Sequence, residues 1–150
     1  MKSIWQENID MPNFDTINCD LEADVLIIGG GICGILCAHT LKNAGINYIL
    51  LEGGRICEKT TANTTAKITS QHGLIYHKLI RKFGIPTAKL YLEANEDAIL
   101  EYESLCKNIN CDFERVDNYV YSLNDCEILK NELLALRKIN FLKTYRFIIQ

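Results

Sequence analysis

A glycine-rich turn between two short apolar runs constrains the fold of this chain more than any other feature. The first run, Val25–Ile28, is typical of a strand that is buried on both faces of a parallel sheet. Residues 29–31 are glycines that end the run, and a helical pattern extends over residues 32–44. Gly45 lies where a glycine that ends the helix is expected, and residues 46–51 form a second apolar run. The order strand, helix, strand predicts one βαβ unit and an α/β fold class.

Three glycines of this turn have the spacing G-x-G-x-x-G, at Gly29, Gly31 and Gly34. The pattern is weak alone, but its place between a strand and a helix predicts a dinucleotide-binding turn. Gly29 permits the tight turn, Gly31 lets the backbone approach a pyrophosphate, and Gly34 lets the helix pack closely on the strand. The helix N-terminus then presents N–H groups and a partial positive charge to the phosphates. The alternative is a glycine-rich turn that binds no ligand.

An acidic residue, Glu52, ends the second apolar run, 23 residues after Gly29. A carboxylate at this place accepts hydrogen bonds from the hydroxyls of an adenosine ribose. Its charge would repel a 2′-phosphate, which argues against NADP, although Arg55 is close enough in sequence to offset that repulsion.

The segments around this unit are predicted from their turn residues and periodicity. Residues 1–23 are expected to form an extended arm, and residues 53–70 a threonine-rich loop. A short helix over residues 74–83 should end at Gly84, and Pro86 should open a longer helix. The apolar positions at helical spacing predict that this longer helix buries the stripe of Tyr91, Ala94, Ala98, Tyr102, Leu105 and Ile109.

The last third of the chain is predicted to hold a small β-hairpin and a further helix. Residues 113–116 and 119–122 flank the turn pair Asp117-Asn118, which favours a two-residue hairpin. Asn124 and Glu127 have the spacing of a capping box before a helix that runs to about Lys138. Residues 139–150 are expected to form a separate tail.

Composition narrows the function classes. The chain has 150 residues and a formal net charge of −3, which gives no reason to expect nucleic acid as a partner. The longest uncharged apolar run has about fourteen residues, too few to span a bilayer, and acidic residues precede it, unlike a secretory signal. A cytoplasmic location is therefore expected, with the seven cysteines present as thiols.

No metal site is expected, because Cys106, Cys111 and Cys126 lack the spacing of zinc ligands. Cys33 and Cys37 are interpreted as small packing residues, with Cys37 facing the core. His72 is predicted either to line a cofactor or to satisfy a loop backbone group.

Three stretches carry a resemblance to a known family. Residues 24–34 (DVLIIGGGICG), 51–56 (LEGGRI) and 60–73 (TTANTTAKITSQHG) resemble FAD-dependent oxidoreductases of the D-amino-acid oxidase and glycine oxidase type. The last stretch resembles the subgroup whose full-length members carry a C-terminal Rieske iron–sulfur domain. The chain departs from the commoner family loop, which has small residues and glycines at positions 57–59 and a glycine at position 66.

The resemblance implies a partial Rossmann-type (FAD/NAD(P)-binding) βαβ unit, with additional helices and the small hairpin, over residues 24–138. It implies FAD as the cofactor. The glycines would hold the pyrophosphate, Glu52 the ribose, Arg55 and the loop hydroxyls the diphosphate, and residues 66–68 would approach the flavin. The cofactor-binding residues implied are Gly29, Gly30, Gly31, Gly34, Glu52, Gly53, Arg55, Thr60, Thr61, Ala66, Lys67 and Ile68.

The reaction implied is oxidation of a C–N bond in an amine or amino acid by hydride transfer to the flavin. The substrate of a full-length relative would be a small molecule, and the resemblance identifies no catalytic residue or oligomeric state in this chain. Because family members have several hundred residues, the chain is expected to be the first part of an oxidoreductase, inactive alone, with an aberrant tail from a frameshift or early stop. The alternatives are a truncated non-catalytic product and a stand-alone NAD or nucleotide-binding module.

Overall fold

A computed structural model describes residues 3, 5, 10–123 and 125–141 of the chain. The chain divides into two compact units, Met1–Lys67 and Ile68–Gln150. The division into an arm, a domain ending at residue 138 and a tail stays a prediction.

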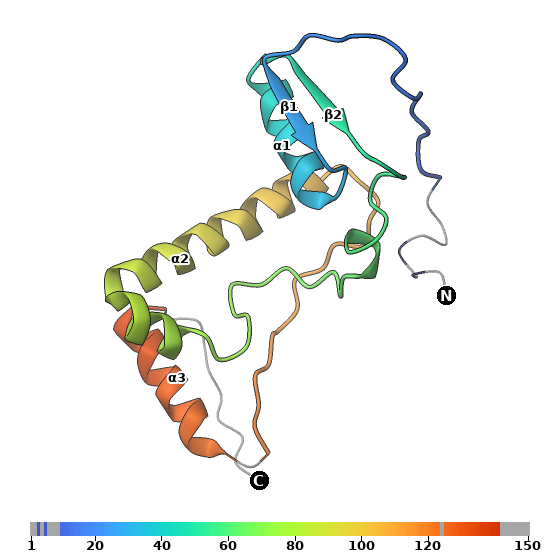
Figure 1. Ribbon diagram of the computed structural model, residues 1–150. Helices are drawn as coiled ribbons and strands as arrows, with labels where there is room; N and C mark the ends of the chain where they lie inside the picture. The colour runs from blue at the N-terminus through green and yellow to red at the C-terminus, as the bar shows by residue number, and fades with distance from the viewer. Residues whose placement is uncertain (1–2, 4, 6–9, 124, 142–150) are drawn as a thin grey trace. The chain divides into compact units, whose positions relative to one another are not determined.

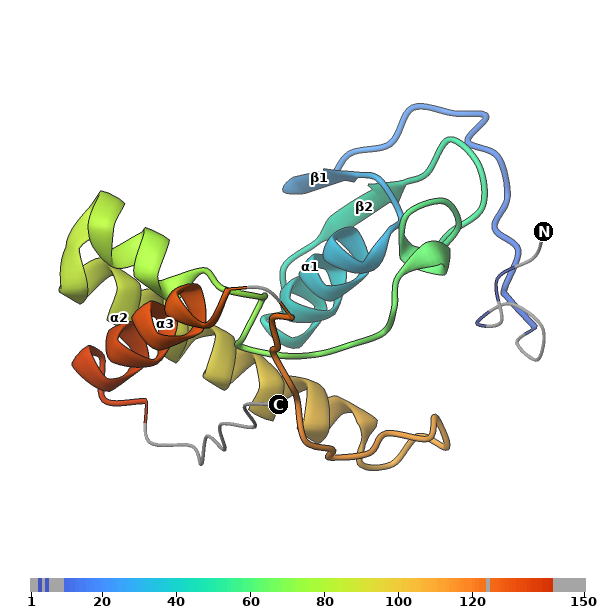
Figure 2. The ribbon, with the colours of Figure 1, turned by 90° about the horizontal axis from the view of Figure 1, so that it is seen from below.

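The first unit is built on a sheet of two parallel strands, as predicted. Strand β1 (Val25–Ile28) pairs with β2 (Tyr48–Leu51), with Val25 opposite Tyr48 and Ile28 opposite Leu51. Helix α1 (Ile32–Asn43) connects them and lies on one face of the sheet (Figures 1 and 2). Parallel neighbours need such a crossover, which explains why the helix separates the two apolar runs.

The end of α1 confirms the predicted glycine cap. Gly45 has φ +69°, a left-handed conformation that glycine adopts without steric cost. The N–H of Gly45 donates to the carbonyl of Lys42 at 3.1 Å, and that of Ile46 donates to Leu41 at 3.0 Å. This pair of hydrogen bonds is the Schellman motif, which satisfies the last helical carbonyls and turns the chain towards β2.

The sheet is covered on one face only, which corrects the prediction that β1 is buried on both faces. Ile27 is 9% exposed, whereas Leu26 and Ile28 are 56% and 83% exposed. Alternate residues of a strand point to opposite faces, and α1 covers only the face of Ile27. The apolar run of β1 therefore buries Ile27 and leaves Leu26 and Ile28 largely exposed.

The second unit contains the long helix α2 (Tyr76–Cys106), which is broken at Gly84. Gly84 has φ 83° and ψ 168°, outside the helical region, and Pro86 follows in the first turn of the second segment. Proline fits there because the first helical N–H groups have no intrahelical acceptor. The predicted end of one helix at Gly84 and start of another near Pro86 is confirmed.

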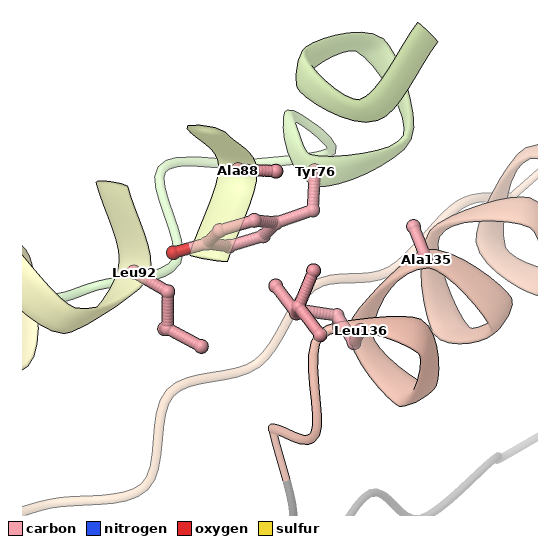
Figure 3. Packing of buried hydrophobic residues seen from close by; sticks show 6 residues of the cluster. Tyr76, Ala88, Leu92, Ala135 and Leu136 are labelled. Carbon is pink, nitrogen blue, oxygen red and sulfur yellow. The ribbon is translucent and has the colours of Figure 1, made fainter. Parts of the chain in front are cut away.

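Helix α3 (Cys126–Lys138) packs against α2 and forms the core of this unit (Figure 3). Tyr76 is fully buried between the two helices, and its hydroxyl donates to the carbonyl of Ser70 at 2.5 Å. Each fully buried side chain of this size stabilises the folded state by about 1.5–3 kcal/mol. The buried cluster consists of Tyr76, Ala88, Leu92, Ala135, Leu136 and Ile139.

A buried carboxylate from α3 caps the start of α2. Glu132 is 3% exposed and accepts the N–H groups of Tyr76 and His77, each at 2.9 Å. The side-chain amide of Gln71 donates to the same carboxylate at 2.9 Å. The first N–H groups of a helix need such acceptors, so Glu132 satisfies α2 and is itself satisfied.

The predicted buried stripe of the longer helix is wrong. Tyr91, Ala94, Ala98 and Ile109 are exposed, and the buried positions are Ala88 and Leu92. The apolar spacing correctly indicated a helix, but α3 packs only on its first turns, so the face was set by a tertiary contact.

The predicted hairpin over residues 113–122 is absent, because the structure has no strand in that described segment. The segment runs as extended coil (orange in Figure 1), and Val116, Tyr119 and Tyr121 are 73–78% exposed. Asn118 instead donates its side-chain amide to Thr69 Oγ1 at 3.0 Å. The turn pair therefore had no packed surface to hold two strands together.

The bounds of α3 agree with the prediction except at the N-cap. Asp125 is the N-cap of α3, accepting the N–H groups of Glu127 and Ile128 at 3.0 and 3.1 Å, and the predicted cap Asn124 lies outside the described residues. The helix ends at Lys138 as predicted, and the next residue, Ile139, is 2% exposed and packs in the core of the unit. The rest of the predicted tail from residue 142 lies outside the described residues.

None of the helices in the described part of the chain is long and apolar enough to cross a membrane. The cytoplasmic location and the absence of a nucleic-acid partner stay predictions.

Candidate functional site

The turn between β1 and α1 is tightly packed. Gly29 has φ +108°, and its N–H donates to the carbonyl of Leu51 at 2.7 Å, which ties the turn to the end of β2. A Cβ atom on Gly34 would lie 1.9 Å from the carbonyl oxygen of Gly29. The helix thus approaches the strand so closely that only glycine fits at position 34, as the spacing predicted.

The middle glycines are required by different neighbours. A Cβ atom on Gly30 would lie 2.8 Å from Ile56 Cγ2 and 3.1 Å from Glu52 Cβ. One on Gly31 would meet only Thr61 Oγ1, at 3.1 Å, among the described atoms within 4 Å. Gly30 therefore faces the loop after β2, whereas Gly31 lies against the hydroxyl of Thr61.

The N-terminus of α1 has no side-chain cap of its own, because its N-cap residue is Gly31. The loop after β2 supplies one acceptor, since Thr61 Oγ1 accepts the N–H of Ile32 at 3.0 Å. Thr61 starts the short 3₁₀ helix η2 (Thr61–Asn63), which fixes its position. A hydroxyl at this place lies beside the helix N–H groups that can bind phosphate oxygens.

Glu52 lies at the end of β2 and binds the backbone of the turn. Its Oε2 accepts the N–H of Gly30 at 2.8 Å, and its Oε1 accepts the N–H of Gly54 at 3.0 Å. These two hydrogen bonds are the main causes that lower the pKa of Glu52. The carboxylate is therefore ionised at neutral pH, and it keeps about two further acceptor positions for hydroxyl donors.

Two cations come from neighbouring segments. Lys59 Nζ lies 4.0 Å from Glu52 Oε1, with a side chain that is 81% exposed, so this ion pair is weak. Arg55 donates through Nη2 to the side-chain oxygen of Asn13 at 3.2 Å. Arg55 thus binds the N-terminal arm, and its predicted place along the diphosphate stays a prediction.

The loop that follows has strained backbone at the positions where the chain departs from the commoner family loop. Cys57, Lys59 and Ala66 have φ values of +54°, +57° and +51°. Side chains other than glycine adopt this region at a cost of about 1–2 kcal/mol per residue. The loop therefore holds non-glycine residues at three positions whose φ values favour glycine.

The remaining loop residues are held by local hydrogen bonds. Thr64 Oγ1 accepts the N–H of Ala66 at 2.9 Å, and the Thr64 carbonyl accepts the indole N–H of Trp5 at 2.9 Å. The carbonyl of Thr60 accepts the N–H of Asn63 at 3.1 Å. The structure thus brings Gly29, Gly30, Gly31, Gly34, Glu52 and Thr61 together.

Other predicted site residues are not brought to this cluster. Lys67 is exposed, and the described contacts assign it no partner there, while Ile68 begins the second unit. Gly53 adjoins the cluster only through its backbone, which forms a further hydrogen bond with Glu52. Their cofactor roles, with that of Thr60, stay predictions. His72 pairs with Asn95 Oδ1 at 3.2 Å, so it contacts a side chain rather than a loop backbone group.

The interpretation of Cys37 as a core residue is wrong. Cys33 and Cys37 are both exposed, and Ala38 is the buried residue of α1. The helix packs on the sheet through the side that contains Gly34 and Ala38, so Cys37 lies beside the buried stripe.

Sequence reasoning missed the contact of Lys59 with Glu52 and the reason for a glycine at position 30. Lys59 lies seven residues from Glu52 in an irregular loop, where no periodicity indicates proximity. In the sequence, the packing at Gly30 is indicated only by the apolar residue Ile56. An apolar side chain so soon after β2 is expected to pack against the neighbouring glycine turn.

The cluster fits the adenosine diphosphate part of a dinucleotide. The N-terminus of α1, whose N-cap is Gly31, suits a phosphate, and the nearby Glu52 carboxylate with further acceptor positions suits ribose hydroxyls.

Comparison with known proteins agrees with this fit. Residues 24–147 match the family model described as FAD-dependent oxidoreductase. The chain is 40% identical over 131 residues to a protein of Bacillus subtilis strain 168 named as a Rieske 2Fe-2S iron–sulfur protein, YhfW. It is 25% identical over 122 residues to gamma-glutamylputrescine oxidoreductase of Escherichia coli K12.

These alignments cover 86% and 77% of this chain but only 26% and 27% of the two relatives. The chain thus spans about a quarter of the length of these relatives. No solved structure matches the chain significantly. The predicted resemblance to this family and to its Rieske-fused subgroup is confirmed, as is FAD as the family's cofactor.

Proposed function

Because the chain belongs to the FAD-dependent oxidoreductase family, we propose that its first unit binds the adenosine diphosphate half of FAD. The N-terminus of α1, where the N-cap is Gly31 and no side chain of the cap residue competes, would bind the pyrophosphate. Thr61 would donate its hydroxyl proton to a phosphate oxygen, because its oxygen already accepts the N–H of Ile32.

Glu52 would bind the ribose. Its two backbone hydrogen bonds hold the carboxylate in one orientation, so little conformational entropy is lost when the ribose hydroxyls donate to it. The same bonds lower its pKa, and an ionised acceptor forms stronger hydrogen bonds than a neutral one.

The observation that carries this proposal is the position of Glu52. Its carboxylate bridges the glycine turn after β1 and the turn after β2, so one side chain links the two segments that would surround the nucleotide.

The proposed activity is oxidation of a C–N bond in an amine or amino acid. Bound FAD would supply the hydride acceptor for this chemistry. The name of the Escherichia coli relative, gamma-glutamylputrescine oxidoreductase, supports an amine as substrate class. The described residues serve the nucleotide end of the cofactor, and we assign none of them to the substrate.

Calorimetric titration with ADP tests the proposal. ADP is expected to bind the wild-type chain, and Glu52→Gln should weaken binding about 10-fold or more, because charge-assisted hydrogen bonds to the ribose are lost. Glu58→Gln is the matched control, since Glu58 is an exposed glutamate of the same loop. Its affinity should equal that of wild type.

The fluorescence of Trp5, which contacts Thr64, would show that each variant keeps the first unit folded. Equal ADP affinities for the Glu52 and Glu58 variants would remove the ribose-binding role. Binding of NAD as tightly as FAD would favour the alternative of a nucleotide-binding module.

A further inference from the structure

The chain reverses direction at the C-terminal end of α2 and brings two cysteines together. Cys106 is the last residue of the helix, and Cys111 follows five residues later. The N–H of Ile109 donates to the carbonyl of Cys106 at 3.0 Å, which closes the first part of the turn. Asp112 has φ +52°, and this left-handed residue directs the chain back along the helix.

An ion pair fastens the base of this turn. Arg115 donates through Nε and Nη2 to the two carboxylate oxygens of Glu103, at 2.8 and 2.5 Å. Glu103 precedes Cys106 by three residues, and Arg115 follows Cys111 by four. The hydrogen bonds from Arg115, and to a smaller extent its charge, lower the pKa of Glu103, so the ion pair persists at neutral pH. A two-point contact of this kind restricts the turn that carries both thiols.

Both cysteines line one hollow of about 690 Å³ in the second unit, together with Leu100 and Phe113. Cys106 is half-buried there, whereas Cys111 is exposed. Burial, followed by a side-chain hydrogen bond with Cys111, raises the pKa of Cys106. The two cysteines therefore line the same hollow at the end of the helix, and Cys111 faces solvent.

We propose that Cys106 and Cys111 form a reversible disulfide, which makes the end of α2 a site of thiol modification by low-molecular-weight disulfides. None of the residues in this turn belongs to the nucleotide-binding cluster, so the inference is independent of the proposed function.

The reaction has two exchange steps. The thiolate of the exposed Cys111 attacks one sulfur of glutathione disulfide, forms a mixed disulfide and releases one glutathione thiolate. The thiolate of Cys106 then attacks the Cys111 sulfur, forms the protein disulfide and releases the second glutathione. Two protein thiols are oxidised, one glutathione disulfide is reduced to two glutathione molecules, and the two protons pass to water or to the released thiolates.

The raised pKa of Cys106 makes the second step depend on pH. Only the thiolate attacks, so ring closure should accelerate as the pH rises and the mixed disulfide should accumulate at lower pH. A structural pair of buried thiols would show no such intermediate.

The test uses the full chain with the other five cysteines, at positions 19, 33, 37, 57 and 126, replaced by serine. After incubation with glutathione disulfide, alkylation and trypsin, the disulfide is identified directly, because Lys107 lies between the two cysteines. Peptides 90–107 and 108–115 should be recovered linked. Cys106→Ser should keep glutathione on Cys111, and Cys111→Ser should acquire little.

A control variant keeps only Cys111 and Cys126, which are both exposed and lie 15 residues apart. Loop-closure entropy alone favours a disulfide between cysteines five residues apart over one between cysteines fifteen residues apart by about 5-fold. In the folded chain, the ratio of the Cys106–Cys111 disulfide to the Cys111–Cys126 disulfide should rise to about 50 or more. The same ratio measured in denaturing urea gives the value expected from loop closure alone. Arg115→Gln should reduce the native ratio, because it releases the base of the turn.

Persistence of the mixed disulfide on Cys111 without linkage would overturn the proposal. So would a native ratio equal to the ratio in urea. Should the serine background fail to give the helical circular dichroism of wild type, the same linked peptides are sought in the wild-type chain. Their absence there at a glutathione ratio that links the pair in urea would equally refute the proposal.

Discussion

Substitution of Gly34 by alanine should destabilise the first unit strongly. The added Cβ atom would lie 1.9 Å from the carbonyl oxygen of Gly29, whereas a carbon–oxygen contact needs about 3.3 Å. The helix α1 must therefore move away from β1 by about 1.4 Å. Gly29 cannot move instead, because its N–H bond to Leu51 and its φ of +108° fix the turn.

The cost should lie at the upper end of the range for overpacking, about 3 kcal/mol in the free energy of unfolding. The movement also loosens the packing of Ile27 and Ala38, the buried residues between β1 and α1. Gly53→Ala is the control, since a Cβ atom there meets nothing within 4 Å, and it should change stability by less than about 0.5 kcal/mol.

Urea denaturation followed by tryptophan fluorescence measures this effect. Trp5 is the single tryptophan, and its hydrogen bond to Thr64 places it in the same unit as Gly34. Far-UV circular dichroism follows mainly α2 and α3 of the second unit. Equal fluorescence midpoints for Gly34→Ala and Gly53→Ala would show that the close packing of helix on strand is not required.

Three further predictions follow from single contacts. Ala66→Gly should raise the urea midpoint followed by fluorescence and add about 1 kcal/mol to the free energy of unfolding, because glycine adopts the φ of +51° without strain. A lower midpoint would contradict the strain assigned to this loop. Because the pKa of Glu52 is lower in the folded than in the unfolded chain, ionised Glu52 stabilises the fold at a pH above its unfolded pKa. This stabilisation is lost as the pH falls through the pKa of Glu52 in the folded chain. Stability of wild type should therefore fall below about pH 4.5 more steeply than that of Glu52→Gln, and parallel curves would refute the linkage. Glu132→Ala should cost about 3 kcal/mol in the second unit, because it leaves buried N–H groups unpaired, whereas Glu127→Ala at an exposed ion pair should cost under about 1 kcal/mol; thermal unfolding by circular dichroism would separate them.

Local rules predicted the first unit well. The strand β1, the helix α1 with its glycine cap and the parallel strand β2 follow from residues within a few positions of each other. The requirement for glycine at position 34 and the carboxylate at position 52 also follow, because spacing alone places them at the turn.

The predictions that failed concern packing that is set by residues far apart in the sequence. The stripe on α2 was misplaced because α3 packs on Ala88 and Leu92, and no spacing within α2 contains that information. Glu132 is far in sequence from the helix start that it caps, so no local sequence pattern indicated this role. The exposed face of β1 shows that a strand can be apolar on both faces while its unit covers one.

Amide chemical shifts during an ADP titration test the central claim most directly, because they locate the ligand residue by residue. Binding at the glycine turn predicts the largest changes at the N–H groups of Gly31, Ile32, Cys33 and Gly34, with a further change at Gly54 beside Glu52. The changes should saturate in wild type and weaken in Glu52→Gln. Changes confined to the second unit, or none at saturating ADP, would contradict a nucleotide site at the start of α1.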